Sequence, residues 1–142
     1  VKKEMKRRFD VAIMAAAAAD YSPENPSKKK IKSTQKVIKI SLKKVPKIIN
    51  QIKQYQKNII LIGFKAEVNL SRKNLIESAS KKLQESNADM IIANDIDSPR
   101  YKKNTENNEV FIIDSGKVRS SGWRKKQNIA KFIKKEIENK FK

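Results

Sequence analysis

Three short apolar runs recur along the chain, separated by more polar segments. They have the length of buried strands and lie at residues 10–15 (DVAIMA), 59–64 (IILIGF) and 89–93 (DMIIA). Nearly continuous apolar runs of this length are typical of parallel strands that are covered on both faces of a sheet. We therefore predict three buried strands in one parallel sheet.

Segments with helical spacing alternate with these runs. Ser71 is a good N-cap for the second helix, and Leu70 and Leu75 are spaced to form a hydrophobic staple around its start. Pro46 is acceptable in the first turn of the first helix. The spacing predicts helices over residues 46–55, over 71 to about 86, and over about 124–141.

Two further segments have strand character. Residues 36–42 (KVIKISL) alternate like a half-exposed strand, and residues 109–114 (EVFIID) precede Gly116 like an outer strand with a turn. Both lie outside the three buried runs, so we expect them at sheet edges or at an interface. Strands that alternate with helices indicate a layered α/β domain with a largely parallel sheet.

Each of the three buried runs ends in small or polar residues. These are residues 16–20 after the first run, 63–67 after the second, and Asn94 and Asp95 after the third. In open α/β sheets, ligands bind outside the carboxyl ends of the strands. Five successive alanines also suit a short helix that ends before Pro23. The crevice interpretation instead predicts a strand end and a loop whose small side chains let a ligand approach the backbone.

The net charge of +19 and the pI of about 10.1 suggest nucleic acid as a partner. The lysines, however, are spread over the whole chain, with only three glycines and no helix-turn-helix or RGG signal among them. A solvated basic surface is therefore favoured over a dedicated nucleic-acid interface. A basic nucleic-acid-binding module stays an alternative.

The chain has no cysteine and no histidine. Disulfides, thiolate nucleophiles, Ser/His/Asp triads and His-ligated metal sites are therefore excluded within it. Any chemistry depends on Lys, Asp, Glu, Asn and backbone groups. The 142 residues suit a single domain, and no apolar run approaches the roughly 20 residues of a membrane span. We expect a cytoplasmic protein whose natural chain begins upstream of Val1.

Four motifs in order resemble one enzyme family, phosphopantothenoylcysteine synthetase. They are A-A-x-A-D-Y-x-P at residues 16–23, a K-I-K loop at 30–32, G-F-K-A-E at 63–67 and A-N-D at 93–95. The resemblance runs from about Phe9 to the final helix. It implies a three-layer Rossmann-like or ribokinase-like domain, which in many bacteria and archaea follows a flavin decarboxylase in one bifunctional protein. FMN would belong only to that fused or partner domain.

The resemblance implies a two-step ligase reaction of coenzyme A biosynthesis. The carboxylate of 4'-phosphopantothenate attacks the α-phosphate of a nucleoside triphosphate, usually CTP in prokaryotes and otherwise ATP, and pyrophosphate leaves. The amine of L-cysteine then displaces the nucleotide to form an amide. Mg²⁺ normally accompanies the triphosphate, and the metal ligands stay unknown. Both nucleophiles belong to substrates, so the enzyme needs cations and positioning rather than His or Cys.

The same resemblance implies roles for individual residues. Lys30, Asn94 and Asp20 are the expected catalytic residues. Glu67 is either a structural or a catalytic carboxylate. The expected nucleotide-binding residues are Ala16, Ala17, Asp20, Lys30, Lys32, Phe64 and Lys82.

The chain also departs from the family pattern. Ser33 stands at the last position of the family's K-x-K-K loop, and Ser86 stands where a second lysine often follows Lys82. Val45, Pro46 and Lys47 replace Asn-Pro-Asp. The family's N-terminal glycine-rich segment is missing, so we expect an N-terminally incomplete copy of one domain over residues 1–142. The family dimerises, which implies a homodimer and leaves a catalytically incomplete dimerisation domain as another alternative.

Overall fold

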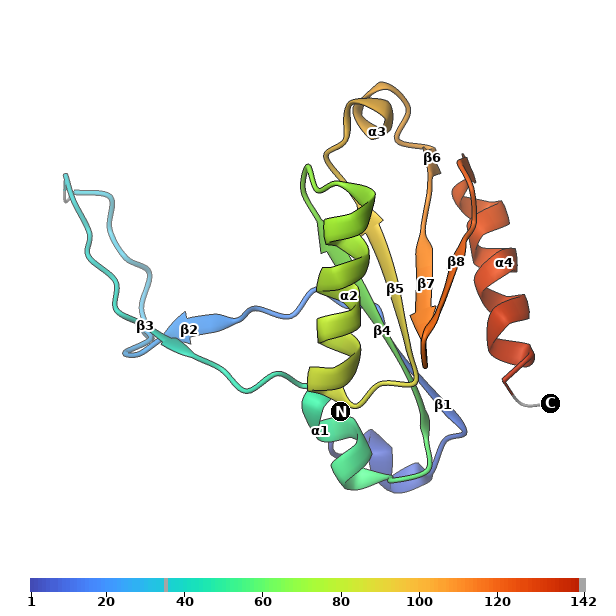
Figure 1. Cartoon of the computed structure of the whole chain (residues 1–142). Helices are drawn as coiled ribbons and strands as arrows, with labels where there is room; N and C mark the ends of the chain where they lie inside the picture. Colours follow the sequence, from blue (N-terminus) through green and yellow to red (C-terminus); the bar gives the residue numbers. More distant parts are fainter. Residues whose placement is uncertain (35, 141–142) are drawn as a thin grey trace.

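A computed structural model describes residues 1–34 and 36–140 of the chain. Its centre is a five-stranded sheet in the order β1-β4-β5-β7-β8 (Figure 1). The three predicted runs form β1, β4 and β5, which confirms the parallel core of the sheet. The five strands are β1 (Val11–Met14), β4 (Ile60–Glu67), β5 (Met90–Asp95), β7 (Phe111–Asp114) and β8 (Lys117–Ser120).

The strand directions agree with a largely parallel sheet. β1 pairs in parallel with β4, and β4 pairs in parallel with β5. β7 is antiparallel to both of its neighbours, so β8 again points the same way as β5. Only β7 therefore runs against the other four strands.

Helices cover both faces of the sheet, as expected for a three-layer domain (Figure 1). α1 (Ile49–Tyr55) and α2 (Arg72–Ser86) lie on one face, and α4 (Lys126–Glu138) lies on the other. Alternation along β5 sends Ile91 toward α2 and Ile92 toward α4, and neither side chain is exposed. The resulting apolar contacts hold the three layers together.

The sequence signals for α2 are confirmed in detail. The Oγ of Ser71 accepts a hydrogen bond from the backbone N–H of Asn74 at 3.2 Å. Leu75 and Ala79 are buried on the side of the helix that faces the sheet, and Leu70 packs against the same cluster. Asn87 ends the helix in the left-handed conformation, with φ of 51°. Capping and burial thus fix the position of α2 on the sheet.

Two predicted helix boundaries are wrong. α1 begins at Ile49 rather than at Pro46, because residues 45–47 have no regular secondary structure and Val45 is bonded to Asp20 instead. Arg124 and Lys125 form β9 (Arg124–Lys125), which pairs with β6 (Asn107–Asn108), so α4 starts only at Lys126. Phe141, which ends the predicted helix, lies outside the described residues.

The prediction that residues 109–114 form an outer strand is also wrong. All four residues of β7 are buried, and the strand lies between β5 and β8. Phe111, Ile112 and Ile113 are apolar although they point to alternate faces, because both faces of the sheet are covered. The strand at the edge is β8, which the sequence analysis does not predict.

An arm leaves the body between β1 and α1 (Figure 1). It starts from an antiparallel pair formed by β2 (Tyr21–Pro23) and β3 (Leu42–Lys44), and its described part comprises residues 24–34 and 36–41. The strand expected over residues 36–42 is wrong, because only Leu42 of that range is in a strand. Val37 and Ile40 keep 74% and 59% of their surface exposed. Among residues 1–34 and 36–140, no strand lies beside the alternating segment to pair with it.

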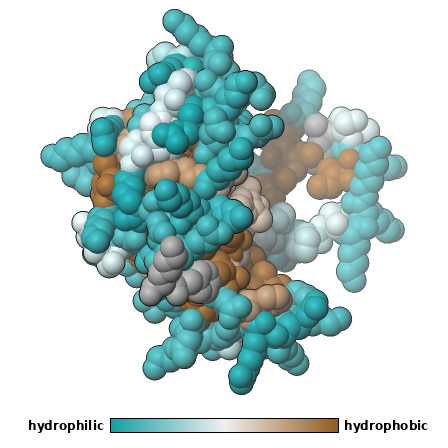
Figure 2. All heavy atoms as spheres, turned by 90° about the vertical axis from the view of Figure 1, so that its right-hand side faces the viewer, coloured by the Kyte–Doolittle hydropathy of each residue, from teal (hydrophilic) through white to brown (hydrophobic). Residues whose placement is uncertain are grey.

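The remaining elements are short. A 3-10 helix, η1 (Glu4–Arg7), places Met5 against α1, and α3 (Pro99–Lys103) follows β5. In the described part of the chain, no helix has the length and apolarity to cross a bilayer. Figure 2 shows mostly hydrophilic side chains on the face that it presents, with apolar patches between them. Hydrophilic residues therefore cover most of this face.

Candidate functional site

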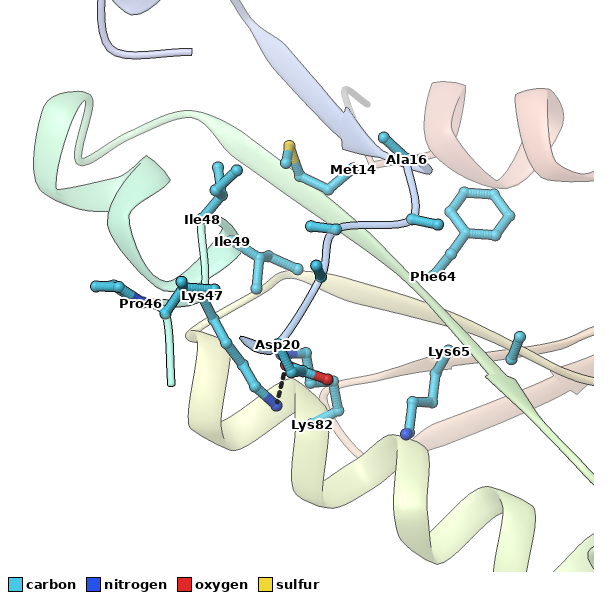
Figure 3. A pocket seen from close by; sticks show the side chains of 15 residues that line it. Met14, Ala16, Asp20, Pro46, Lys47, Ile48, Ile49, Phe64, Lys65 and Lys82 are labelled. Atoms are coloured by element: carbon cyan, nitrogen blue, oxygen red, sulfur yellow. Dashed lines mark ion pairs between the residues drawn. The ribbon is translucent and has the colours of Figure 1, made fainter. Parts of the chain in front are cut away.

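A pocket of about 590 Å³ opens where β1 ends and β4 continues. β1 stops at Met14, opposite Gly63, whereas β4 runs on to Glu67. Beyond Gly63, the edge of β4 on the side of β1 pairs with no described strand. The loop after β1 and the start of α1 border the space that is left there. The volume is in the range of small-molecule sites. Its lining includes Met14, residues 16–20 and 45–49, Phe64, Lys65, Ala66 and Lys82 (Figure 3).

The alanines form one wall of this pocket. Residues 15–19 are neither helix nor strand, and their side chains are exposed. The prediction of a strand end followed by a loop is therefore confirmed, and the alternative of a short helix is wrong. A backbone hydrogen bond from the N–H of Val45 to the carbonyl of Asp20, at 2.9 Å, ties this loop to the segment before α1. The small side chains leave the backbone accessible from the pocket.

Asp20 places a carboxylate at the pocket wall. Its Oδ1 lies 3.8 Å from the Nζ of Lys47, and both side chains are largely exposed (Figure 3). Lys47 comes from the Val45-Pro46-Lys47 segment that departs from the family pattern. That departure therefore puts a cation beside Asp20 and within the pocket lining.

Lys82 reaches the pocket from α2. Partial burial lowers the pKa of its ammonium from 10.5, and the charges of Lys47 and Lys65 lower it further. The carboxylates of Glu85 and Asp20 act in the opposite direction. The pocket thus concentrates positive charge, which favours an anionic ligand.

Alternation along β4 separates two side chains of the G-F-K-A-E motif. Phe64 and Lys65 both line the pocket, but they point to opposite faces of the sheet (Figure 3). The Nζ of Lys65 lies 2.9 Å from Oε1 of Glu67, on the face toward α2. The same carboxylate oxygen accepts a hydrogen bond from the Oγ of Ser78 at 2.6 Å. The bond from Ser78 and then that from Lys65 hold the pKa of Glu67 below 4.5.

The structure brings together only part of the expected site. Ala16, Ala17, Asp20, Phe64 and Lys82 line one pocket. Lys30 and Lys32 lie on the arm and do not line it. Asn94 is half-buried in β5, opposite Ala66, and it also lies outside the lining.

Sequence reasoning missed an apolar wall and a cation. Val45, Ile48 and Ile49 line the pocket opposite the alanines, next to Met14. The helical spacing of Ile48 and Ile49 predicts a buried face but carries no signal for a ligand. Lys65 is also part of the lining, and a lone lysine is not informative in a chain with 34 lysines and arginines. Together, an apolar wall and several cations suit a ligand that has both a ring and phosphates.

The donors in the pocket fit Mg²⁺ only when a ligand brings it. Mg²⁺ is commonly held by one or two carboxylates together with substrate phosphates. Asp20 is the one carboxylate in the described lining of this pocket. Residues 1–34 and 36–140 contain no cluster of three acidic side chains that could hold the ion alone. Asp20 would therefore be the protein ligand of an ion carried by a polyphosphate.

The sequence matches a known domain family over almost its whole length. A model of the DNA/pantothenate metabolism flavoprotein C-terminal domain matches residues 1–141. The coenzyme A biosynthesis bifunctional protein CoaBC of Thermococcus kodakarensis is 32% identical over 139 residues. These residues are 97% of this chain and 33% of that protein. The chain therefore spans about one third of that relative's length.

Solved structures show the same fold. The DNA/pantothenate metabolism flavoprotein from Streptococcus pneumoniae superposes with a TM-score of 0.78 at 28% identity, over 96% of this chain and 67% of that chain. The C-terminal domain of a coenzyme A biosynthesis bifunctional protein CoaBC superposes with a TM-score of 0.70 at 31% identity. That match covers 98% of this chain and 58% of the other.

Proposed function

The chain belongs to the DNA/pantothenate metabolism flavoprotein C-terminal domain family, and we propose that it is the ligase part of a coenzyme A biosynthesis protein. The family membership expected from the motifs is confirmed. The proposed reaction joins 4'-phosphopantothenate and L-cysteine at the expense of a nucleoside triphosphate, CTP in preference to ATP. The single observation that carries this proposal is the pocket at the end of β1, with Asp20, Lys47 and Lys82 in its lining.

In the proposed first step, the substrate carboxylate forms a bond to the α-phosphorus, and the bond to the β-phosphate oxygen breaks. Pyrophosphate leaves and an acyl-nucleotide remains. Lys82 and Lys47 would neutralise charge on the phosphates, and charge neutralisation of this kind is a main contribution to phosphoryl and nucleotidyl transfer. Mg²⁺, when bound, supplies further neutralisation of the polyphosphate.

In the proposed second step, the amine of cysteine attacks the acyl carbon, an amide bond forms, and the nucleoside monophosphate leaves as the amine loses a proton. The chain's contribution is orientation. The alanine loop would hold the nucleotide against the backbone, and the wall of Val45, Ile48 and Ile49 would exclude water from one side. Keeping two reactants in place can replace much of the entropy cost of their encounter.

Lys30, Lys32 and Asn94 require a separate explanation, because they lie outside the pocket lining. We propose that the protein is a homodimer and that the arm of one copy brings Lys30 and Lys32 to the pocket of the other. The exposed apolar residues of the arm support this arrangement, since Val37, Ile38 and Ile40 have surface available for a partner. Asn94 would contact phosphopantothenate or cysteine rather than the nucleotide.

The proposed function is tested by pyrophosphate release. The protein is incubated with CTP, Mg²⁺, phosphopantothenate and cysteine, and each component is omitted in turn. Release that requires both phosphopantothenate and CTP, and that is lost in Lys30→Ala, supports the ligase. Unchanged release in Lys30→Ala contradicts the role of Lys30. Binding of duplex DNA that falls steeply with salt, without any binding of free CTP, favours the nucleic-acid alternative.

A further inference from the structure

We propose that Lys65, a lysine of β4 in the pocket lining, binds the phosphates of the nucleotide. This inference rests on the proposed function, because it names a further residue of the same site. Lys65 lines the pocket together with Lys47 and Lys82, and Asp20 is the only acid in the described lining. The described lining therefore holds three lysines and a single carboxylate.

The position of Lys65 is fixed by its neighbours. Its Nζ lies 2.9 Å from Oε1 of Glu67, which Ser78 on α2 holds by a hydrogen bond of 2.6 Å. The link from α2 through Ser78 and Glu67 aims the ammonium along the face of β4 that looks toward α2 (Figure 3). An ammonium has three donors, and Glu67 takes one of them. Two N–H groups stay available for phosphate oxygens.

The state of Glu67 supports this placement. Its hydrogen bonds from Ser78 and Lys65 keep the pKa of the carboxyl below its ordinary value, so Glu67 is ionised at neutral pH. Because the side chain of Lys65 is 33% exposed, the ammonium is accessible from the pocket while its position is fixed.

Two positions that carry lysine in the family pattern are serines here. Ser86 is buried, its Oγ donates a hydrogen bond to the carbonyl of Lys82 at 2.7 Å, and it is not part of the pocket lining. Ser33 lies on the arm, outside the lining. Lys47 and Lys65 place positive charge in the pocket from the segment before α1 and from β4. A bound polyphosphate would thus be neutralised from these two segments rather than from the two positions that are serines here.

A purely structural role of Lys65, as the partner of Glu67, makes a different prediction. In that case, removing the ammonium weakens CTP and CMP binding equally or leaves both unchanged. A phosphate-binding role weakens CTP far more than CMP, because CMP lacks the β- and γ-phosphates. The ratio of the two dissociation constants therefore separates the roles.

The experiment measures the dissociation constants of CTP and CMP, with Mg²⁺, by calorimetry. The proteins are the wild type, Lys65→Met, Lys65→Arg and Lys73→Met, whose residue is an exposed lysine on α2 outside the pocket lining. We expect Lys65→Met to raise the dissociation constant of CTP by about tenfold or more and that of CMP by less than about threefold. Lys65→Arg should restore most of the lost CTP affinity. Lys73→Met should match the wild type. Thermal melts verify that each variant folds, and Lys65→Gln replaces Lys65→Met if the latter does not.

The outcomes separate this inference from the proposed function. An unchanged ratio of CTP to CMP affinity in Lys65→Met, with tight CTP binding by the wild type, overturns the role of Lys65 alone. A failure of the wild type to bind CTP overturns both. An equal loss in Lys65→Met and Lys73→Met also overturns the inference, because it indicates a general effect of surface charge.

Discussion

Lys47 and Asp20 face each other across the mouth of the pocket, with 3.8 Å between Nζ and Oδ1. The two residues come from segments 27 positions apart, at the two ends of the arm, and the backbone bond between Val45 and Asp20 aligns these segments. The ion pair is exposed and therefore contributes little to stability. Its consequence is for the ligand, because Lys47 compensates the charge that Asp20 would present to a phosphate.

Asp20→Ala should abolish binding of the Mg²⁺-nucleotide, because Asp20 would be the protein ligand of the ion that the polyphosphate carries. The substitution should leave folding unchanged. The side chain of Asp20 is 61% exposed, so we expect the free energy of unfolding to change by no more than about 0.5 kcal/mol. Nucleotide titrations and urea unfolding measure the two quantities. Glu77→Ala, at an exposed position on α2, is the matched control. Tight CTP binding by Asp20→Ala would refute the assigned role.

Lys82 should make stability depend on pH in the alkaline range. Burial, with Lys47, depresses the pKa of Lys82 in the folded protein below 10.5, so the unfolded chain binds more protons in the window just below 10.5. The contribution of Lys82 to the free energy of unfolding therefore rises with pH through that window. Urea unfolding should show the rise in the wild type and a flatter profile in Lys82→Met. Parallel profiles would contradict the depressed pKa.

A CTP titration provides a second test of Lys82. The negative charge of bound phosphates favours the protonated ammonium, so binding at alkaline pH should take up a proton. Calorimetry in two buffers of different ionisation enthalpy measures this uptake. The uptake should be smaller in Lys82→Met, whereas Lys81→Met, next to it on α2, should resemble the wild type.

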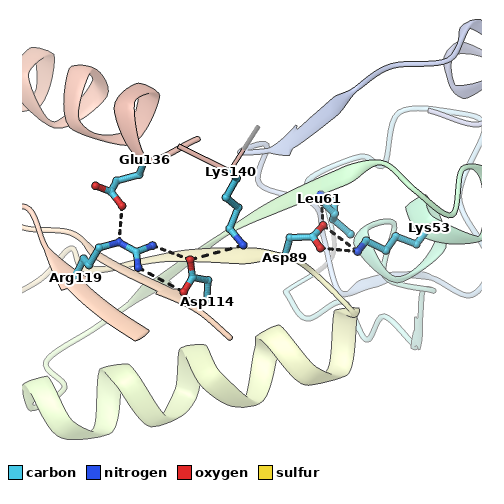
Figure 4. Close-up of polar contacts among 7 residues, drawn as sticks. All are labelled: Lys53, Leu61, Asp89, Asp114, Arg119, Glu136 and Lys140. Atoms are coloured by element: carbon cyan, nitrogen blue, oxygen red, sulfur yellow. Dashed lines mark hydrogen bonds and ion pairs between the residues drawn. The ribbon is translucent and has the colours of Figure 1, made fainter. Parts of the chain in front are cut away.

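Asp114→Asn should destabilise the far edge of the sheet. Arg119 donates to Asp114 at 2.8 Å and also pairs with Glu136 on α4, while Lys140 lies 3.7 Å from Asp114 (Figure 4). The carboxyl side chain is only 9% exposed, so we expect a loss of about 1–3 kcal/mol at neutral pH. Asp89 forms a separate cluster with Lys53 and the N–H of Leu61.

The effect of Asp114→Asn should also depend on pH. Burial acts to raise the pKa of Asp114, but Arg119 and Lys140 outweigh it and hold the pKa below 3.8. Stability from this carboxylate is therefore present above 3.8 and is lost as the pH falls through the folded-state pKa. Urea unfolding of wild type and variant should converge in acid. A constant difference at all pH values would contradict the ion pair.

The sequence was most informative where local signals and burial agree. Ser71 caps α2, and the continuous apolar runs became β1, β4 and β5, because the same residues satisfy both the period and the core. The strand predicted over residues 36–42 is wrong, because an alternating pattern forms a strand only where a partner strand is available to pair with it. Arg124 and Lys125 were assigned to a helix, whereas pairing with β6 holds them extended.

For the site, residue identity alone could not separate functional lysines from the rest. Lys82 stands out only through its position on the helix before A-N-D, where the family carries a lysine. Lys47 stands out only as a departure from the family pattern, and Lys65 only as one letter of the G-F-K-A-E motif. No role follows for either from the sequence, because each is one lysine among many. Their importance depends on Asp20 and Glu67 in the folded protein. Lys30 shows the reverse case, since its motif is clear but the fold of one chain leaves it on the arm.

Gly63→Ala should destabilise the fold by overpacking beside the pocket. A Cβ there would lie 2.6 Å from Cδ1 of Ile49 and 2.8 Å from Cδ1 of Ile91. Insertion of a methyl group into such a contact costs about 1–3 kcal/mol. Adding Ile49→Val should recover part of this loss, which thermal or urea unfolding can measure. If the double variant is no more stable than Gly63→Ala, the contact with Ile49 is not the cause.

The proposed dimer predicts complementation between two inactive variants. Asp20→Ala and Lys30→Ala are each expected to lose turnover. If Lys30 acts on the pocket of the partner, mixed dimers should regain about half of the activity of a wild-type dimer, because one of their two sites is intact. Pyrophosphate release after mixing and subunit exchange measures this. No recovery in verified mixed dimers would place Lys30 in its own chain's pocket.

The most direct test of the central claim is a calorimetric titration of the protein with CTP and Mg²⁺, repeated with ATP and with Asp20→Ala. We expect saturable binding with one site per chain, tighter for CTP than for ATP, and no binding by Asp20→Ala. Equal binding by the wild type and by Asp20→Ala would contradict the claim that the pocket at the end of β1 is the nucleotide site.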